Sequence, residues 1–270
     1  MAISQLKDKI TLTKEQKEVL YGALLGDGCL YLHRNGKNAQ FTYLSKSRQH
    51  VEYVGNYFQQ YWSGEDIKDT SYFDDRTQKE YYHSQVKTYT NETFTEEYYK
   101  WYVDGIKHLP KDLVLTPLMC LIWYIGDGGI CHANRTEYIK LSTQCFSKEE
   151  QEVILLPQLS KFEASLMKTD NEQYFIYIPR RKEAEFLQYI GNCPFEDYKY
   201  KWEITPYKNS KPKNHKEHEN EFCEMYKQGM TYYAIAKHFG IEPNAVKYYL
   251  KNIIYIKILN ERSYIPYERK

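Results

Sequence analysis

The sequence predicts an α+β protein made of two copies of an αββαββα unit, followed by a small all-α segment at the C-terminal end. Two observations favour this fold class. A Gly-Asp-Gly triplet ends an apolar helical segment at residues 26–28 and again at residues 126–128, and the predicted elements follow both triplets in the same order. From about residue 217 onward the periodicity is helical throughout. An internal repeat of this kind implies a molecule with approximate twofold symmetry.

The first copy begins with a helix that Thr13 and Gln16 open as a capping box and that runs into the segment VLYGALLGDG. The next segments alternate apolar and polar residues, as strands do, and turn residues at 35–38 separate the first two. The remaining predicted elements are a hairpin from 29–34 and 39–45, a helix at 51–58, a second hairpin from 71–75 and 80–89, and a tyrosine-rich helix at 93–104.

The second copy repeats this order. Thr116 caps a helix that has Pro117 in its first turn and contains LMCLIWYIGDGG. Ser147 and Glu150 form the capping box of another helix, which we expect Pro157 to kink or interrupt. The other predicted elements are strands at 130–133, 137–143 and 174–178 and a helix at 180–190.

The C-terminal segment reads as three short helices, with breaks at Gly229 and Gly240. This spacing is typical of a helix-turn-helix, although a plain helical hairpin packed on the main domain gives a similar pattern. The predicted domains are therefore two similar subdomains, a basic linker and a helix-turn-helix, at 10–105, 106–205, 206–216 and 217–260.

Composition places the chain among ordinary globular proteins, since 42% of its 270 residues are hydrophobic and 27% are charged. No apolar run approaches the roughly 18 residues that a membrane span needs, and residues 1–16 do not resemble a secretory signal. The six cysteines form no CxxC pair, which favours reduced thiols and argues against zinc. We therefore expect a cytoplasmic protein, in a nucleoid or an organelle matrix.

The charge is balanced overall but uneven along the chain. The net charge is only +1, whereas DNA-binding domains are usually basic. Residues 199–216, however, contain six lysines and a single acid, Glu203. This stretch could contact phosphates, or it could be a solvated linker.

The two aspartates of the triplets carry the strongest chemical signal. An aspartate at the C-terminal end of a helix is unfavourably placed, because the helix dipole is negative there and the last carbonyl groups lack partners. A divalent cation at each helix end would remove both problems, with oxygen ligands from Asp27 and Asp127 and from the carbonyl groups of Gly26 and Gly126. A chance aspartate beside a glycine cap explains one copy of the triplet, but it is a weak explanation for two copies in matching places.

The segments VLYGALLGDG and MCLIWYIGDGG resemble the two signature helices of LAGLIDADG homing endonucleases, in the single-chain branch with two motifs. The resemblance covers residues 10–205. It implies two subdomains whose curved antiparallel sheets form a saddle over DNA, and a Mg²⁺ site at Asp27 and Asp127 that Mn²⁺ could also fill. The second copy departs from the pattern, because Ile122 stands where the first copy has Gly22.

The resemblance also implies a catalytic lysine late in each half. Lys107 and Lys199 match this pattern, with Lys201 as a close rival of Lys199. Internal alignment pairs Lys46 with Gln144, and either side chain could order water or contact a phosphate. Each of these residues, taken alone, could equally be an ordinary surface residue.

Amide, guanidinium and ammonium groups on exposed strand faces and on the third helix of the tail would contact DNA. A polar solvated surface would have the same composition. The candidate DNA-binding residues are Arg34, Asn35, Lys37, Gln40, Thr42, His83, Gln85, Lys87, Asn134, Arg135, Lys140, Asn244, Lys247, Tyr248 and Lys251.

The function that the resemblance implies is cleavage of double-stranded DNA at a long asymmetric site by a monomer, in support of the mobility of an intron or a similar element. Two alternatives stay open. The chain could be an RNA maturase that assists intron splicing, or a transcription regulator that joins an inactive LAGLIDADG domain to a helix-turn-helix.

Overall fold

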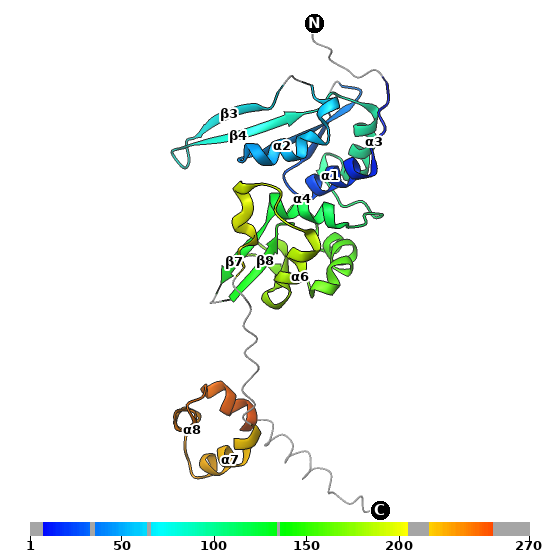
Figure 1. Ribbon diagram of the computed structural model, residues 1–270. Helices are drawn as coiled ribbons and strands as arrows, with labels where there is room; N and C mark the ends of the chain where they lie inside the picture. Colours follow the sequence, from blue (N-terminus) through cyan, green and yellow to red (C-terminus); the bar gives the residue numbers. More distant parts are fainter. Residues whose placement is uncertain (1–7, 33–35, 64–65, 134–135, 205–215, 251–270) are drawn as a thin grey trace, which may run out of the picture. The chain divides into compact units, whose positions relative to one another are not determined.

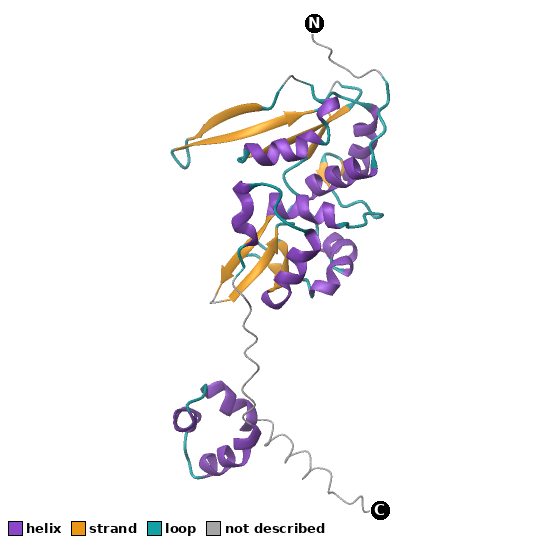
Figure 2. Ribbon diagram, viewed as in Figure 1, coloured by secondary structure: helices purple, strands orange, loops and turns teal. Residues whose placement is uncertain are grey.

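The computed structural model describes residues 8–32, 36–63, 66–133, 136–204 and 216–250 (Figure 1). The chain divides into two compact units, residues 1–207 and residues 208–270, and each is described by itself. The larger unit contains both predicted repeats, and the smaller unit contains helices only (Figure 2).

The first repeat has the predicted order of helices and strands. Its four strands form one antiparallel sheet in the order β1-β2-β4-β3. The elements are α1 (Lys14–Leu25), β1 (Cys29–Leu32), β2 (Ala39–Ser45), α2 (Arg48–Asn56), a 3₁₀ turn (Gln59–Tyr61), β3 (Lys68–Asp74), β4 (Lys79–Lys87) and α3 (Glu92–Trp101).

The second repeat has a sheet of the same topology, with the order β7-β8-β10-β9. The predicted αββαββα order includes a strand at the place of β9, but the sequence analysis assigned no residues to it. The elements are α4 (Pro117–Asp127), β7 (Gly128–Ala133), β8 (Thr136–Leu141), α5 (Lys148–Glu150) continued by a π-helical turn (Gln151–Leu155) and a 3₁₀ helix (Pro157–Phe162), β9 (Ser165–Lys168), β10 (Tyr174–Pro179), α6 (Arg180–Ile190) and a 3₁₀ helix (Glu196–Trp202).

Local sequence signals explain how these helices begin and end. The capping boxes at Thr13 and Ser147 are both present. The interruption predicted at Pro157 is also present, as a π-helical turn in which the amide of Leu156 donates to the carbonyl of Gln151 over 3.0 Å. This wider turn accommodates a residue that cannot donate a hydrogen bond.

The tyrosine-rich helix ends earlier than the sequence pattern predicted, at Trp101 rather than at 104. The chain continues as β5 (Tyr102–Val103), turns, and pairs with itself as β6 (Ile106–Lys107). Gly105 lies in this turn with a φ of +77°, a conformation that favours glycine. The short hairpin joins the two repeats.

Helices α1 and α4 pack side by side in the centre of the larger unit (Figure 1). Leu20, Leu24, Trp123 and Ile125 on these helices are fully buried. At Gly22 the helices touch closely, since a β-carbon there would lie 2.7 Å from the carbonyl oxygen of Met119. Gly22 of α1 thus packs against Met119 and Ile122 of α4.

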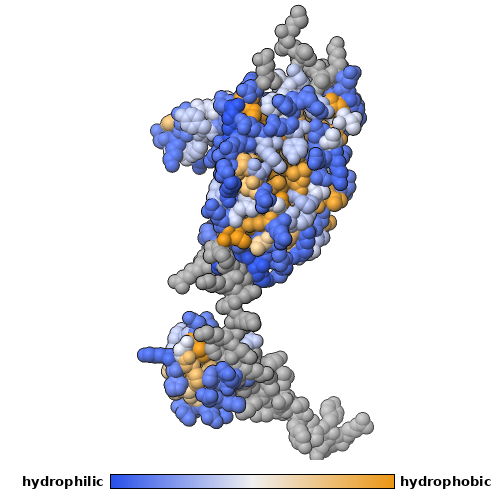
Figure 3. Space-filling view, in the orientation of Figure 1, coloured by the Kyte–Doolittle hydropathy of each residue, from blue (hydrophilic) through white to orange (hydrophobic). Residues whose placement is uncertain are grey.

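Hydrophilic residues cover much of both units, and hydrophobic ones also reach the visible face of the larger unit (Figure 3). No helix in the described part of the chain is long and apolar enough to cross a membrane.

The smaller unit has its own hydrophobic core. It contains a 3₁₀ turn (Lys216–His218), α7 (Glu219–Lys227), α8 (Tyr232–Phe239) and a helical stretch at 243–250. The inward orientation predicted for Val246 and Leu250 is confirmed, because both are buried, whereas Ile253 lies outside the described residues. The core side chains are Phe222, Ile235, Ala236, Val246 and Leu250.

The close contact at Gly22 predicts that one added methyl group, in Gly22→Ala, lowers the stability of the protein. In Gly22→Ala the new β-carbon would clash with the backbone of α4, so we expect the free energy of unfolding to fall by about 1–3 kcal/mol. Alanine's higher helix propensity would offset only part of this loss. Gly129→Ala is the control, because no heavy atom of the described residues would lie within 4 Å of its β-carbon. Urea unfolding curves that coincide for Gly22→Ala and the unaltered protein would contradict the close packing.

Candidate active site

The C-terminal ends of α1 and α4 bring the two Gly-Asp-Gly triplets together. A β-carbon at Gly126 would lie 3.3 Å from Oδ2 of Asp27, and one at Gly26 would lie 3.6 Å from the amide nitrogen of Asp127. Each glycine therefore leaves room for the aspartate of the other repeat. The two carboxylates come from different halves of the chain and lie at one place.

The final glycine of each triplet permits a tight turn from helix to strand. The amide of Gly28 donates to the carbonyl of Ala23 over 2.8 Å, and the amide of Gly128 donates to the carbonyl of Tyr124. A β-carbon at Gly128 would lie only 2.7 Å from that carbonyl oxygen. The turn leads from Asp127 directly into β7, so the aspartate adjoins the sheet.

Two lysines occupy the helix ends, one in each half. Nζ of Lys107 donates to the carbonyl groups of Leu24 and Gly28, at 2.8 and 3.0 Å. Such bonds satisfy carbonyl oxygens near the end of each helix, and the ammonium groups place positive charge at the negative end of each helix dipole. The matching bonds in the second half run from Nζ of Lys201 to Ile125 (2.6 Å), Gly128 (2.8 Å) and Gly126 (3.4 Å).

The structure places Lys201, rather than Lys199, beside the aspartates. Lys201 is only 8% exposed, whereas Lys199 is exposed and forms an ion pair with Glu196. The 3₁₀ helix explains the difference, because residues two apart in such a helix point to different sides. We therefore replace Lys199 by Lys201 in the candidate site and keep Lys107.

Burial and mutual repulsion shift the pKa values of these groups. Burial and the neighbouring Asp27 carboxylate raise the pKa of Asp127 to about 6, although the lysines oppose the shift. Burial also raises the pKa of Asp27. In the same place burial lowers the pKa of Lys201 to about 8, and it lowers that of Lys107. Carboxylates that repel one another in this way favour a divalent cation between or beside them.

The oxygen donors fit a hard cation such as Mg²⁺. Among the described residues there is no cluster of three or more His, Cys, Asp or Glu side chains that could hold a metal. Two carboxylates and nearby glycine carbonyl groups would therefore need water or a phosphate to complete the coordination. Magnesium sites that act on phosphates are commonly built in this way, with one or two carboxylates.

Lys46 and Gln144 follow matching strands, β2 and β8, as their internal alignment implied. Lys46 is exposed, and its Nζ lies 5.6 Å from the centre of the Tyr81 ring on β4. Gln144 is partly buried, next to Cys145. Burial raises the pKa of the Cys145 thiol, Lys107 lowers it, and Asp127 raises it further. Gln144 therefore adjoins a residue that interacts electrostatically with two groups of the candidate site, Lys107 and Asp127.

Several predicted DNA contacts share one face of the first sheet. The antiparallel register places Thr42 opposite Lys87, and side chains alternate along a strand, so Gln40, Gln85 and His83 lie on the same face as this pair. Lys37 is exposed before β2, and Thr42 is 8% exposed. The sequence analysis missed other residues on this face that the pairing with β3 reveals, namely Lys68, Thr70 and Tyr72.

In the second sheet, Lys140 lies on the corresponding face, with its Nζ 4.8 Å from the centre of the Phe175 ring. Tyr138 and Tyr177 share this face, and neither was predicted to contact DNA. Four predicted contacts lie outside the described residues, namely Arg34, Asn35, Asn134 and Arg135.

In the smaller unit, Asn244, Lys247 and Tyr248 are exposed on the last helical stretch. Their common exposure agrees with a face opposite the buried Val246 and Leu250. Lys251 lies outside the described residues.

Comparison with known proteins points to one family. The sequence model of the LAGLIDADG DNA endonuclease family matches residues 17–186, which include both triplets, most of α1 and all of α4. A probable intron-encoded endonuclease 1 of Wickerhamomyces canadensis is 26% identical over 207 residues, which cover 72% of this chain and 87% of the relative.

Two further relatives match a smaller share of this chain. The DNA endonuclease I-ChuI of Chlamydomonas applanata is 30% identical over 155 residues, or 52% of this chain and 69% of the relative. The cytochrome b mRNA maturase bI2 of Debaryomyces hansenii is 28% identical over 182 residues, which cover 62% of this chain and 65% of the relative.

A solved structure supports the same fold. The homing endonuclease I-WcaI, bound to its DNA recognition sequence, superimposes with a TM-score of 0.60 at 24% identity, over 66% of this chain and 80% of that chain. The extent of the family match, together with paired helices that end in two facing aspartates, shows that this chain belongs to the LAGLIDADG DNA endonuclease family.

Proposed function

We propose that this protein is a homing endonuclease that hydrolyses both strands of a long, asymmetric DNA site with the help of Mg²⁺. The observation that carries the proposal is the meeting of Asp27 and Asp127 at the point where both sheets begin. Each aspartate lies beside a lysine, and of these Lys201 is buried and Lys107 partly buried. Relatives named as intron-encoded and DNA endonucleases support the same activity. Both aspartates of the motif are present, which argues against an inactive regulator.

The aspartates and the lysines of the site would have different roles in the reaction. Asp27 and Asp127, with the carbonyl groups of Gly26 and Gly126, would hold the metal, and Mn²⁺ would substitute for it. When bound, the metal supplies positive charge for the phosphate and activates water. Lys107 and Lys201 hold their ammonium groups beside the aspartates, where they would stabilise negative charge that develops on the phosphate.

The open faces of the two sheets would contact the DNA, through amide, hydroxyl and basic side chains in the major groove. Because both halves lie in one chain and their faces differ, a monomer would suit an asymmetric site. The smaller unit would add a helix-turn-helix contact to flanking DNA, through Asn244, Lys247 and Tyr248.

A second candidate function is RNA maturation, and the likeness to the maturase of Debaryomyces hansenii favours it. The two activities could coexist. Splicing of a precursor RNA that contains the chain's own intron, measured with and without the purified protein, tests this candidate separately from DNA cleavage.

The aspartate assignment predicts that Asp27→Asn and Asp127→Asn each abolish double-strand cleavage, while specific DNA binding persists. Each substitution keeps the shape of the side chain and removes the charge that would hold the metal. Cleavage of a plasmid with the target site, beside a gel-shift assay in Ca²⁺, measures both properties. Cleavage by either variant at the rate of the unaltered protein would refute the assignment.

The raised pKa of Asp127 predicts a gain in stability from the same inactivating change. The pKa of about 6 in the folded protein exceeds the ordinary value of 3.8, so in metal-free protein the free energy of unfolding falls as the pH rises through this interval. Asp127→Asn removes this penalty, and at pH 8 it should raise the free energy of unfolding by about 1–2 kcal/mol, allowing for partial exposure.

The gain should shrink as the pH falls from 6 towards 3.8, because the carboxyl group is then protonated in the folded state and increasingly protonated in the unfolded state. Urea unfolding at pH 8 and pH 4 in EDTA measures the difference, and Asp112→Asn is the control. A gain that is equal at both pH values would contradict an electrostatic origin.

The division into two units predicts that removal of residues 208–270 leaves metal-dependent cleavage intact, because both aspartates lie in the larger unit. The truncated protein should have a shorter DNA footprint on one side. Its affinity should also depend less steeply on salt, with a slope lower by about one for each lost lysine–phosphate contact. If the footprint and the salt slope stay the same, the smaller unit does not bind DNA.

A further inference from the structure

Each lysine of the site lies on a short segment that also contacts the opposite half of the protein. We call residues 106–110 the first strap and residues 195–202 the second strap. The first strap pairs with β5 and carries Lys107, which caps α1. It is therefore counted with the first half, although the sequence-based boundary after residue 105 had put it in the second. The second strap carries Lys201, which caps α4 in the second half.

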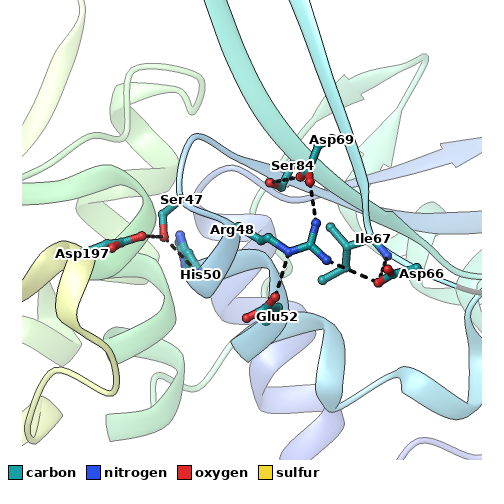
Figure 4. A network of polar contacts seen from close by, with 9 residues as sticks. All are labelled: Ser47, Arg48, His50, Glu52, Asp66, Ile67, Asp69, Ser84 and Asp197. Carbon is teal, nitrogen blue, oxygen red and sulfur yellow. Dashed lines mark hydrogen bonds and ion pairs between the residues drawn. The ribbon is translucent and has the colours of Figure 1, made fainter.

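The second strap is bound by the N-terminal turn of α2, in the first half (Figure 4). Oγ of Ser47 donates to Oδ2 of Asp197 over 2.5 Å. Oε1 of Gln49 accepts from the backbone amides of Glu196 and Asp197, at 3.1 and 3.4 Å. Arg48, between these two residues, instead pairs with acids of its own half, so the turn divides its contacts between the halves.

An aromatic contact extends this attachment towards the lysine. The ring of His50 is fully buried and lies 5.4 Å from the rings of both Phe195 and Tyr198. The hydroxyl of Tyr198 is 3.2 Å from Oγ of Ser45. The centre of the Tyr198 ring is in turn 4.7 Å from Nζ of Lys201. A continuous set of contacts therefore joins α2 to the ammonium group.

The first strap is bound in the same manner by the second half. Oε1 of Glu150, in the first turn of α5, accepts from the amide of Leu109 over 2.9 Å and lies 3.1 Å from Nδ1 of His108. The other carboxylate oxygen of Glu150 closes the capping box with Ser147. The strap residue next to Lys107 is thus fixed to the other repeat.

The two attachments are related by the internal repeat. Ser47 and Ser147 are the N-caps of the corresponding helices, and each first turn holds the strap of the opposite half. We propose that Asp197 and Glu150 are positioning residues, and that each half of the protein thereby fixes the catalytic lysine of the other half. This inference rests on the proposed function, because it assigns the two lysines to the cleavage reaction.

The proposal predicts opposite strand preferences when the straps are released one at a time. If each lysine serves the cut in one DNA strand, release of the second strap should slow one cut and release of the first strap should slow the other. Loss of one or two hydrogen bonds from a positioned group corresponds to about a fivefold slower cut. A general loss of folding would slow both cuts together.

Asp197→Ala removes the hydrogen bond between Ser47 and the second strap and so loosens the strap. Glu196→Ala is its matched control. The two acids are neighbours, but the Glu196 side chain is exposed and pairs with Lys199 of its own strap. Glu150→Ala releases the first strap, with the exposed neighbour Glu149→Ala as its control.

Cleavage rates of the two strands are measured on a duplex that contains the target site and carries a different label on each strand. We expect Asp197→Ala and Glu150→Ala to accumulate nicked DNA with opposite strands cut, and the two controls, Glu196→Ala and Glu149→Ala, to cut both strands as the unaltered protein does. Equal slowing of both strands by both variants, or the same strand preference in both, would overturn the proposal.

A second measurement tests the straps without DNA. Reaction of the folded protein with acetic anhydride, followed by mass spectrometry, reports how accessible each lysine is. Asp197→Ala should increase acetylation of Lys201 about fivefold and leave Lys107 unchanged, and Glu150→Ala should do the reverse. Unchanged acetylation in both variants would refute the straps. A protein that cuts no DNA but shows these changes would refute the proposed function alone.

Discussion

The contact between the C-terminal ends of α1 and α4 is the constraint on which the rest of the structure depends. Glycines at the crossing allow the helices to approach until Gly126 lies against the carboxylate of Asp27. This approach brings together two carboxylates, that of Asp27 exposed and that of Asp127 partly buried, and burial together with the repulsion from Asp27 raises the pKa of Asp127 to about 6. A fold that served stability alone would avoid such an arrangement. Its persistence is understandable if a cation or a phosphate-bound metal relieves the repulsion during function.

The two lysines partly offset the repulsion between the carboxylates. Lys107 and Lys201 donate hydrogen bonds to carbonyl groups at the ends of α1 and α4, which reduces the number of helix-end oxygens left to other partners. The same ammonium groups oppose the upward shift of the pKa of Asp127. Burial lowers the pKa of Lys201 to about 8. Burial thus disfavours the charged form of this lysine, and the surrounding hydrogen bonds and carboxylates must offset that effect. Precise placement of these lysines, through the two straps, therefore matters for both stability and chemistry.

Much of the fold was predictable because its signals are local. Capping boxes, strand alternation and the repeated triplet fixed the order of elements in both halves, and Pro157 marked the π-helical turn. The assignment between Lys199 and Lys201 depended on the rotation of a 3₁₀ helix, which residue spacing alone does not specify. The partners of Asp197 lie about 150 residues away in sequence, so no periodicity could reveal them. Strand β9 is short and only partly buried, and it therefore has a weak pattern.

The most direct test of the central claim is an anomalous difference map from a crystal of the protein bound to its DNA target in the presence of Mn²⁺. The account predicts manganese peaks in contact with the carboxylates of Asp27 and Asp127, with Nζ of Lys107 and Lys201 still at the helix ends. Manganese bound elsewhere, with both aspartates free of metal while the DNA occupies the sheets, would contradict it.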